Sequence, residues 1–286
     1  MTRSEKRPDG TLAAGEILDR IIKAKAIRLA AAKMAVPLGH IIAQANAVAS
    51  TRIRRSLAES LLITGRLNII AEIKQCSPSK GLIREDFDPV SIAGAYDENG
   101  AAAMSVLAEE DFFGGSLDHV RQIRPLTDVP LLRKDFIFDE YQIYESVAAG
   151  ADAVLLIVAV LDDDLLGRLF ELAGRLGLDA LVEVHTAEEM ERARQIGARI
   201  IGINNRDLAK LKPGGEARET DLKTSYRLAE LAPGGAALVS ESGINSVDDI
   251  RNLKAAGFNG FLIGEHFMRA SDPGLALRQM IVAASD

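Results

Sequence analysis

Eight short apolar runs, separated by longer amphipathic stretches, most restrict the fold of this 286-residue chain. The runs cover residues 67–74, 101–108, 129–136, 152–160, 178–185, 198–205, 236–243 and 258–265. Most of the amphipathic stretches end in Gly just before the next run, as in "ESVAAGADAV" and "LKAAGFNG". Gly at a helix end followed by an apolar run is typical of a helix that leads into a buried strand. The pattern therefore predicts a parallel sheet covered by helices.

Eight such units within residues 67–286 fit a closed (β/α)8 TIM barrel, with an open doubly wound sheet as the alternative. No GxGxxG motif follows the first run, which disfavours a dinucleotide-binding sheet. We expect a flexible tail over 1–10, a helical extension over 11–66 and a catalytic barrel over 67–286, forming a single domain. An apolar stripe from Ile17 to Leu29 predicts that the extension docks on the barrel.

Composition excludes several classes of protein. The longest apolar run has nine residues, from Ala153 to Leu161, about half of what a membrane span needs. The single cysteine, Cys76, excludes an intrachain disulfide, and the polar start of the chain does not resemble a secretory signal, so we expect a cytoplasmic protein. Residues 1–66 carry 12 Lys and Arg against 5 Asp and Glu, whereas the rest carries 22 against 36. That acidic bulk and the absence of Trp argue against nucleic-acid binding.

Polar side chains gather where the predicted strands end, which is where TIM barrels hold their active sites. These residues are Glu72, Lys74, Lys134, Glu183, Asn204, Arg206, Glu241 and Ser242. Four of them could instead be structural ion pairs, Glu72 with Lys74 or Lys134 with Glu183. Because ionisable groups are costly inside a barrel and five strand ends carry them, we favour an active site.

These groups suit proton transfer. Apolar neighbours lower the pKa of a lysine, so Lys134 is a candidate general acid, and burial raises the pKa of a glutamate, so Glu183 is a candidate base. A Schiff-base role for Lys134 is the alternative that spacing leaves open. The four histidines have neither Cys partners nor zinc-ligand spacing, so we expect no metal site.

Two turns predict a phosphate site. "SESGI" at 240–244 and "IGEHF" at 263–267 place Gly243 and Gly264 beside Ser242 and Glu265, after the last two strands. Barrels often bind phosphate there through backbone N–H groups. The loop at 76–81, "CSPSKG", adds hydroxyls and a lysine and is expected to close over a ligand.

Seven motifs, taken in order, resemble those of the indole-3-glycerol phosphate synthase family. They are "IIAEIKQCSPSKG" (69–81), "SVLAEEDFFGGS" (105–116), "PLLRKDFIFDEYQIYES" (130–146), "LVEVHT" (181–186), "IGINNRDL" (201–208), "VSESGI" (239–244) and "FLIGEHFM" (261–268). The resemblance implies a TIM barrel with a helical extension and a carboxy-lyase of tryptophan biosynthesis. It implies as substrate the phosphorylated small molecule 1-(2-carboxyphenylamino)-1-deoxyribulose 5-phosphate, which is cyclised, decarboxylated and dehydrated without a cofactor.

The resemblance also implies roles for single residues. Lys134 corresponds to the general acid and Glu183 to the base, while Glu72 and Asn204 hold the ring nitrogen and sugar hydroxyls. The implied substrate-binding residues are Lys74, Ser77, Phe113, Phe136, Arg206, Glu241 and Ser242, and the phosphate-binding residues are Ser242, Gly243, Gly264 and Glu265. Of these, Phe113 and Phe136 resemble walls against the aromatic ring.

Two departures from the family pattern concern the loops. Ala108 replaces a hydroxyl residue, and the stretch 209–222 is longer than usual. The alternatives are another phosphate-binding barrel, such as phosphoribosylanthranilate isomerase or the tryptophan synthase α subunit, or a catalytically silent phosphate sensor. Neither alternative barrel explains the extension or "KDF" at 134–136. A weak association with other enzymes of the tryptophan pathway stays open.

Overall fold

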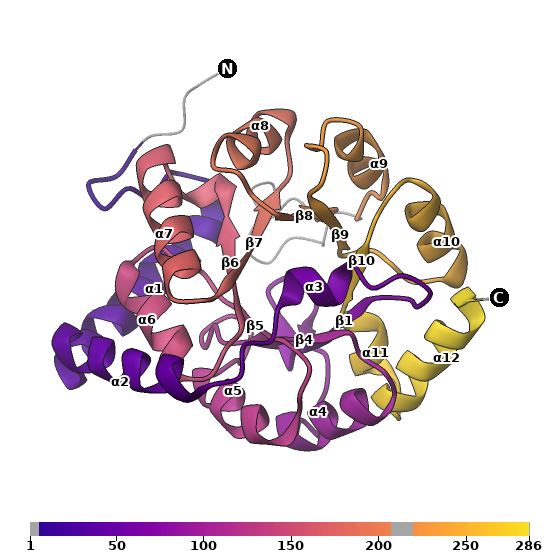
Figure 1. Cartoon of the computed structure of the whole chain (residues 1–286), viewed down its shortest axis with the longest axis horizontal. Helices are drawn as coiled ribbons and strands as arrows, with labels where there is room; N and C mark the ends of the chain where they lie inside the picture. Colours follow the sequence, from indigo (N-terminus) through magenta and orange to yellow (C-terminus); the bar gives the residue numbers. More distant parts are fainter. Residues whose placement is uncertain (1–5, 207–219, 286) are drawn as a thin grey trace.

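The computed structural model describes residues 6–206 and 220–285, and in them eight parallel strands close into a barrel (Figure 1). The order around the barrel is β1-β10-β9-β8-β7-β6-β5-β4. The strands are β1 (Ile69–Ile73), β4 (Ala103–Leu107), β5 (Leu131–Lys134), β6 (Ala153–Ile157), β7 (Asp179–Val184), β8 (Ile200–Asn204), β9 (Ala237–Glu241) and β10 (Gly260–Ile263). Each lies within one of the eight predicted runs, so the TIM barrel is confirmed.

Helices cover the outside of the barrel between successive strands (Figure 1). They are α4 (Pro89–Glu98), α5 (Leu117–Ile123), α6 (Glu140–Ala148), α7 (Asp163–Arg175), α8 (Ala187–Gln195), α9 (Lys223–Ala229), α10 (Val247–Ala255), α11 (Glu265–Arg269) and α12 (Pro273–Ser285), with the 3-10 turns η1 (Arg124–Leu126) and η2 (Val158–Val160). Carboxylate or hydroxyl side chains begin many of them; Asp139 caps α6, and Ser246 forms a capping box on α10. Predicted Gly turns have positive φ, for example 85° at Gly150 and 93° at Gly257, which favours glycine there.

The N-terminal extension forms three helices: α1 (Glu16–Ala35), α2 (Leu38–Thr51) and α3 (Leu57–Leu61). The predicted apolar stripe of α1 is buried, so the extension docks on the barrel as expected. The α3 helix lies near the amino ends of the strands, where Ser60 Oγ donates to Ala102 O. The α2 helix, which the apolar pattern does not predict, packs against α6. No single helix in the described ranges is long and apolar enough to span a bilayer.

A turn over Lys6–Leu12 precedes these helices. The two residues at its ends pair across it, and Thr11 bridges to Leu161 after η2. Lys6 Nζ also lies 2.6 Å from an Asp162 carboxylate oxygen. Residues 6–10 thus contact the barrel through backbone pairing and an ion pair, while the flexible tail expected over 1–10 stays a prediction; residues 1–5 lie outside the described ranges.

Candidate active site

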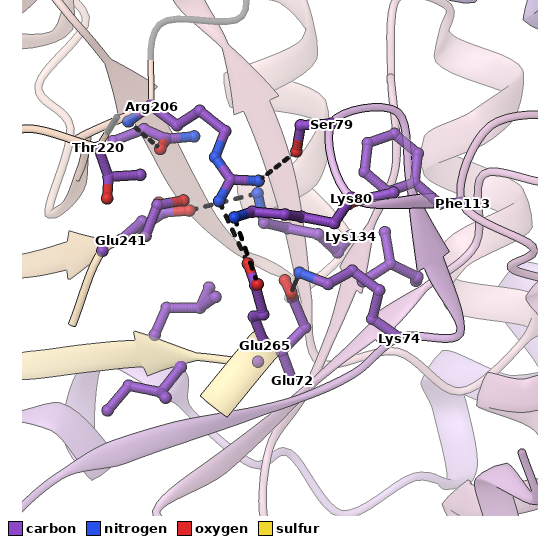
Figure 2. Close-up of a pocket in the computed structure, with 18 of the residues that line it drawn as sticks. Glu72, Lys74, Ser79, Lys80, Phe113, Lys134, Arg206, Thr220, Glu241 and Glu265 are labelled. Carbon is purple, nitrogen blue, oxygen red and sulfur yellow. Dashed lines mark hydrogen bonds and ion pairs between the residues drawn. The ribbon is translucent and has the colours of Figure 1, made fainter. Parts of the chain in front are cut away.

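One pocket lies at the carboxyl ends of the barrel strands, and Figure 2 draws part of its lining. Every site residue proposed from the sequence lines it. They are Glu72, Lys74, Ser77, Phe113, Lys134, Phe136, Glu183, Asn204, Arg206, Glu241, Ser242, Gly243, Gly264 and Glu265. Residues more than 190 positions apart in the chain thus share one cavity, because parallel strands bring their carboxyl ends to one side of the barrel.

Lys134 lies at the centre of this pocket. Its Nζ is 3.1 Å from a Glu183 carboxylate oxygen and 3.2 Å from a Glu241 carboxylate oxygen. Strand β5, which carries Lys134, lies opposite β9, which carries Glu241, in the closed order of strands. The lysine side chain therefore crosses the mouth of the barrel (Figure 2).

The pKa of Lys134 is raised, not lowered as the sequence alone suggested. Burial works to lower it, but the negative charges of Glu183, Glu241 and Glu72 raise it by more. The sequence around Lys134 does not show that carboxylates on three other strands lie beside this lysine in the fold. Lys134 is therefore an ammonium ion at neutral pH, which suits a proton donor.

The two carboxylates beside Lys134 differ in pKa. Burial raises the pKa of Glu241 to about 7, with the negative charges of Glu183 and Glu72 adding to the effect and Lys134 opposing it. Burial acts in the same direction on Glu183, but Lys134 and His185 lower its pKa below the ordinary value. The raised glutamate pKa expected at Glu183 thus belongs to Glu241, because His185 and a hydrogen bond from Asn204 lower only that of Glu183.

Glu72 and Lys74 form the second ion pair proposed from the sequence, at the end of β1. The pair faces the cavity, so the structural ion-pair layer and the active site are built from the same side chains. A side chain at Gly264 would meet the Glu72 carboxylate. Glycine after β10 therefore leaves room for Glu72 as well as for a ligand.

Two consecutive residues after β9 form a turn with positive φ, at the place where the sequence predicts phosphate binding. Ser242 and Gly243 have φ values of 67° and 77°, and Ser242 is the described non-glycine residue with positive φ. Successive residues in this region point backbone N–H groups toward one spot, a geometry that binds anions. The turn faces Gly264 and Glu265 across the pocket mouth.

A hairpin of β2 (Cys76–Ser77) and β3 (Gly81–Leu82) carries Lys80 at the pocket mouth, next to Arg206, which follows β8. Arg206 donates to Ser79 Oγ at 2.7 Å, and the Glu265 carboxylate lies 3.5 Å from Arg206 and 3.7 Å from Lys80 Nζ (Figure 2). Glu265 therefore neutralises the two cations that an incoming phosphate would meet.

Aromatic and aliphatic side chains form the opposite wall of the pocket. The rings of Phe113 and Phe136 lie 6.2 Å apart at an interplanar angle of 37°. Leu107 on β4 joins them, as do Leu155 and Ile157 on β6. Since β4 to β6 lie across the barrel from β9 and β10, the pocket has an apolar end opposite the end that holds Ser242, Gly243 and Gly264.

Sequence reasoning missed some residues of the site. Leu155 and Ile157 belong to a strand that carries no charged end, so nothing set them apart from core residues. Gly202 on β8 leaves the space in which the Glu241 carboxylate lies. The lengthened stretch 209–222 falls mostly outside the described ranges, which resume at Thr220. Within those ranges no group of His, Cys, Asp and Glu is arranged to hold a metal.

The sequence of the chain matches one family of known proteins. The model of the family "Indole-3-glycerol phosphate synthase" matches residues 18–280. The indole-3-glycerol phosphate synthase of Albidiferax ferrireducens is 46% identical over 269 residues, covering 94% of this chain and 99% of the relative. That of Carboxydothermus hydrogenoformans is 44% identical over 268 residues, covering 92% and 99%.

Solved structures show the same fold at low sequence identity. A thiamine phosphate pyrophosphorylase from Pyrococcus furiosus matches with a TM-score of 0.57 and 20% identity, over 80% of this chain and 98% of that one. A 3-hexulose-6-phosphate synthase matches with a TM-score of 0.59 and 18% identity, over 76% and 99%. These two structures show the fold alone.

The family model and the two relatives from Albidiferax and Carboxydothermus show the family. The chain belongs to the indole-3-glycerol phosphate synthase family and is a carboxy-lyase of tryptophan biosynthesis.

Proposed function

We propose that Lys134 is the general acid of this reaction and Glu183 its base, acting on 1-(2-carboxyphenylamino)-1-deoxyribulose 5-phosphate. The observation that carries this proposal is the position of the Lys134 ammonium between Glu183 and Glu241. The raised pKa of Lys134 keeps a proton available, and the lowered pKa of Glu183 keeps its carboxylate ionised. An acid and a base are thus held side by side in their active protonation states.

Ring closure uses the proton of Lys134. The ring carbon that bears the carboxylate attacks the ribulose carbonyl carbon, and the lone pair of the aniline nitrogen supplies the electrons and leaves an iminium. The carbonyl oxygen takes the Lys134 proton and becomes a hydroxyl. The bond to the carboxylate carbon then breaks, CO2 leaves, and the electron pair of that bond neutralises the iminium.

Dehydration completes the indole. The new hydroxyl leaves as hydroxide, driven by the nitrogen lone pair, and the adjacent methylene carbon loses a proton to Glu183. Hydroxide and that proton together make the water that is released, and Lys134 regains its proton from solvent. Glu241 lies beside the reacting sugar, while Glu72 and Asn204 hold the ring nitrogen and hydroxyls.

The two ends of the pocket suit the two ends of the substrate. The aromatic ring lies against Phe113 and Phe136, and the phosphate lies at the turns of Ser242, Gly243, Gly264 and Glu265. Lys74, Ser77 and Arg206 hold the carboxylate and phosphate groups. This orientation places the carbonyl in the centre of the pocket, near Lys134.

The direct test is Lys134→Met, assayed by the fluorescence of the indole product, which this Trp-free chain does not obscure. We expect kcat to fall roughly 10²–10⁴-fold because the variant lacks the general acid. Inorganic phosphate should still inhibit competitively in any residual activity. A variant with normal kcat and a raised KM would contradict the acid role.

Borohydride separates this role from Schiff-base chemistry. A Schiff base needs a neutral amine, which the raised pKa of Lys134 disfavours. We expect that borohydride added with substrate traps no covalent adduct. A mass increase located at Lys134 would show that this residue forms a Schiff base and is not the general acid.

We also propose a single domain made of the barrel and its extension, in the cytoplasm, where a free Cys76 stays reduced. Association with other enzymes of the pathway remains a prediction, which pull-down of purified pathway enzymes tests.

A further inference from the structure

Lys25 of the extension makes a buried contact with the loops behind the aromatic wall. Its ammonium lies 2.8 Å from an Asp135 carboxylate oxygen and 2.8 Å from a Glu110 carboxylate oxygen. It also donates to Ala108 O at 3.2 Å. Its side chain is 5% exposed, so this charge is held by protein groups rather than by water.

Asp135 connects this contact to Phe136. One carboxylate oxygen of Asp135 accepts from Lys25 and from Arg133, and the other accepts from the backbone N–H of Phe136 at 2.9 Å. Asp135 follows Lys134 in the chain, and the Lys134 carbonyl accepts from the Ala108 N–H at 2.9 Å. The end of β5 is therefore fixed on the side facing α1.

The loop that carries Phe113 is fixed from the same side. Glu110, which pairs with Lys25, belongs to this loop. Its neighbour Glu109 is buried and accepts from the N–H groups of Asp111, Phe112 and Phe113 at 2.8–3.1 Å. Lys25 thus contacts both segments whose aromatic rings face each other in the pocket.

No residue of the described extension lines the pocket, so Lys25 would act on a ligand through the residues that it contacts. We propose that Lys25 is a positioning residue for the substrate's aromatic ring, acting through Asp135 and the 108–113 loop on Phe136 and Phe113. This rests on the proposed orientation of the substrate. The Lys134 ammonium itself is held by Glu183 and Glu241, and Lys25 pairs with neither carboxylate, so we expect Lys25 to act mainly on binding.

The test is Lys25→Met, with Lys33→Met as the matched control. Lys33 also pairs α1 with the barrel, at 2.6 Å from Asp139, but touches neither aromatic segment. We expect Lys25→Met to raise KM about three- to tenfold, the worth of an aromatic contact, with kcat within about twofold of wild type. The dissociation constant of 2-aminobenzoate, measured by calorimetry without turnover, should rise with KM, while that of inorganic phosphate stays unchanged.

Three results for Lys25→Met would overturn the proposal. The first is a lower melting temperature with a KM equal to that of Lys33→Met. The second is an equal weakening of 2-aminobenzoate binding and phosphate binding, and the third is a loss of kcat. If Lys25→Met does not fold, Lys25→Gln, which keeps a donor for Asp135 without the charge, replaces it under the same criteria. Inhibitor binding is measured without turnover, so a failure of the Lys134 acid role would not be mistaken for a failure of this one.

Discussion

The carboxylate of Glu241 occupies the space that a side chain at Gly202 would fill, on the neighbouring strand of the barrel. Both residues lie in the buried interior, where a Cβ at Gly202 would also lie 3.3 Å from Leu181 Cδ1. The position of Glu241 beside Lys134 thus depends on the absence of a methyl group on β8.

We expect Gly202→Ala to displace Glu241 from Lys134 and to lower kcat roughly 10- to 100-fold, since small misplacements of reacting groups are costly. Steady-state kinetics with the fluorescent product measures this. Gly94→Ala is the control, because a Cβ there meets nothing within 4 Å. Equal kcat values for the two variants would show that Glu241 adapts without cost.

The raised pKa of Glu241 makes stability depend on pH. The unfolded carboxyl ionises near its ordinary value of 4.5, whereas the buried one holds its proton to about 7. The folded state therefore binds the extra proton between these values, and this contribution to stability is lost as pH rises through 7.

Glu241→Gln removes that dependence. We expect its melting temperature, relative to wild type, to rise by roughly 5 °C between pH 5 and pH 8. Thermal unfolding followed by circular dichroism at both pH values measures the difference. A constant offset between variant and wild type across this range would mean that Glu241 titrates normally.

At the proposed phosphate site Glu265 binds through its backbone N–H, while its carboxylate competes with the anion for Arg206 and Lys80. We expect Glu265→Gln to lower the inhibition constant of inorganic phosphate about two- to fivefold, because a partly exposed ion pair of this kind is worth little more. Glu191→Gln, on exposed α8, is the control. A higher inhibition constant in Glu265→Gln would show that the carboxylate organises the anion site instead of filling it.

Features that depend on neighbouring residues in the chain could be predicted from the sequence. Apolar runs, Gly turns and the residues at strand ends depend on neighbours in the chain, so the barrel and the residues of the pocket could be predicted. The pKa of Lys134 could not, because its sign depends on carboxylates from β1, β7 and β9. For the same reason, the empty space at Gly202 and the pairing of Lys25 with Asp135 are visible only in three dimensions.

The docking of α1 also has a consequence for biosynthesis on the ribosome. The Ala108 carbonyl, which accepts a hydrogen bond from the Lys25 ammonium, lies 83 residues after Lys25 in the chain. At translation rates of about 5–20 residues per second, the nascent α1 waits roughly 4–17 s for this partner in the barrel. Its apolar stripe is solvent-exposed during that interval, so the emerging chain presents a ready substrate for chaperones before any barrel exists to cover it.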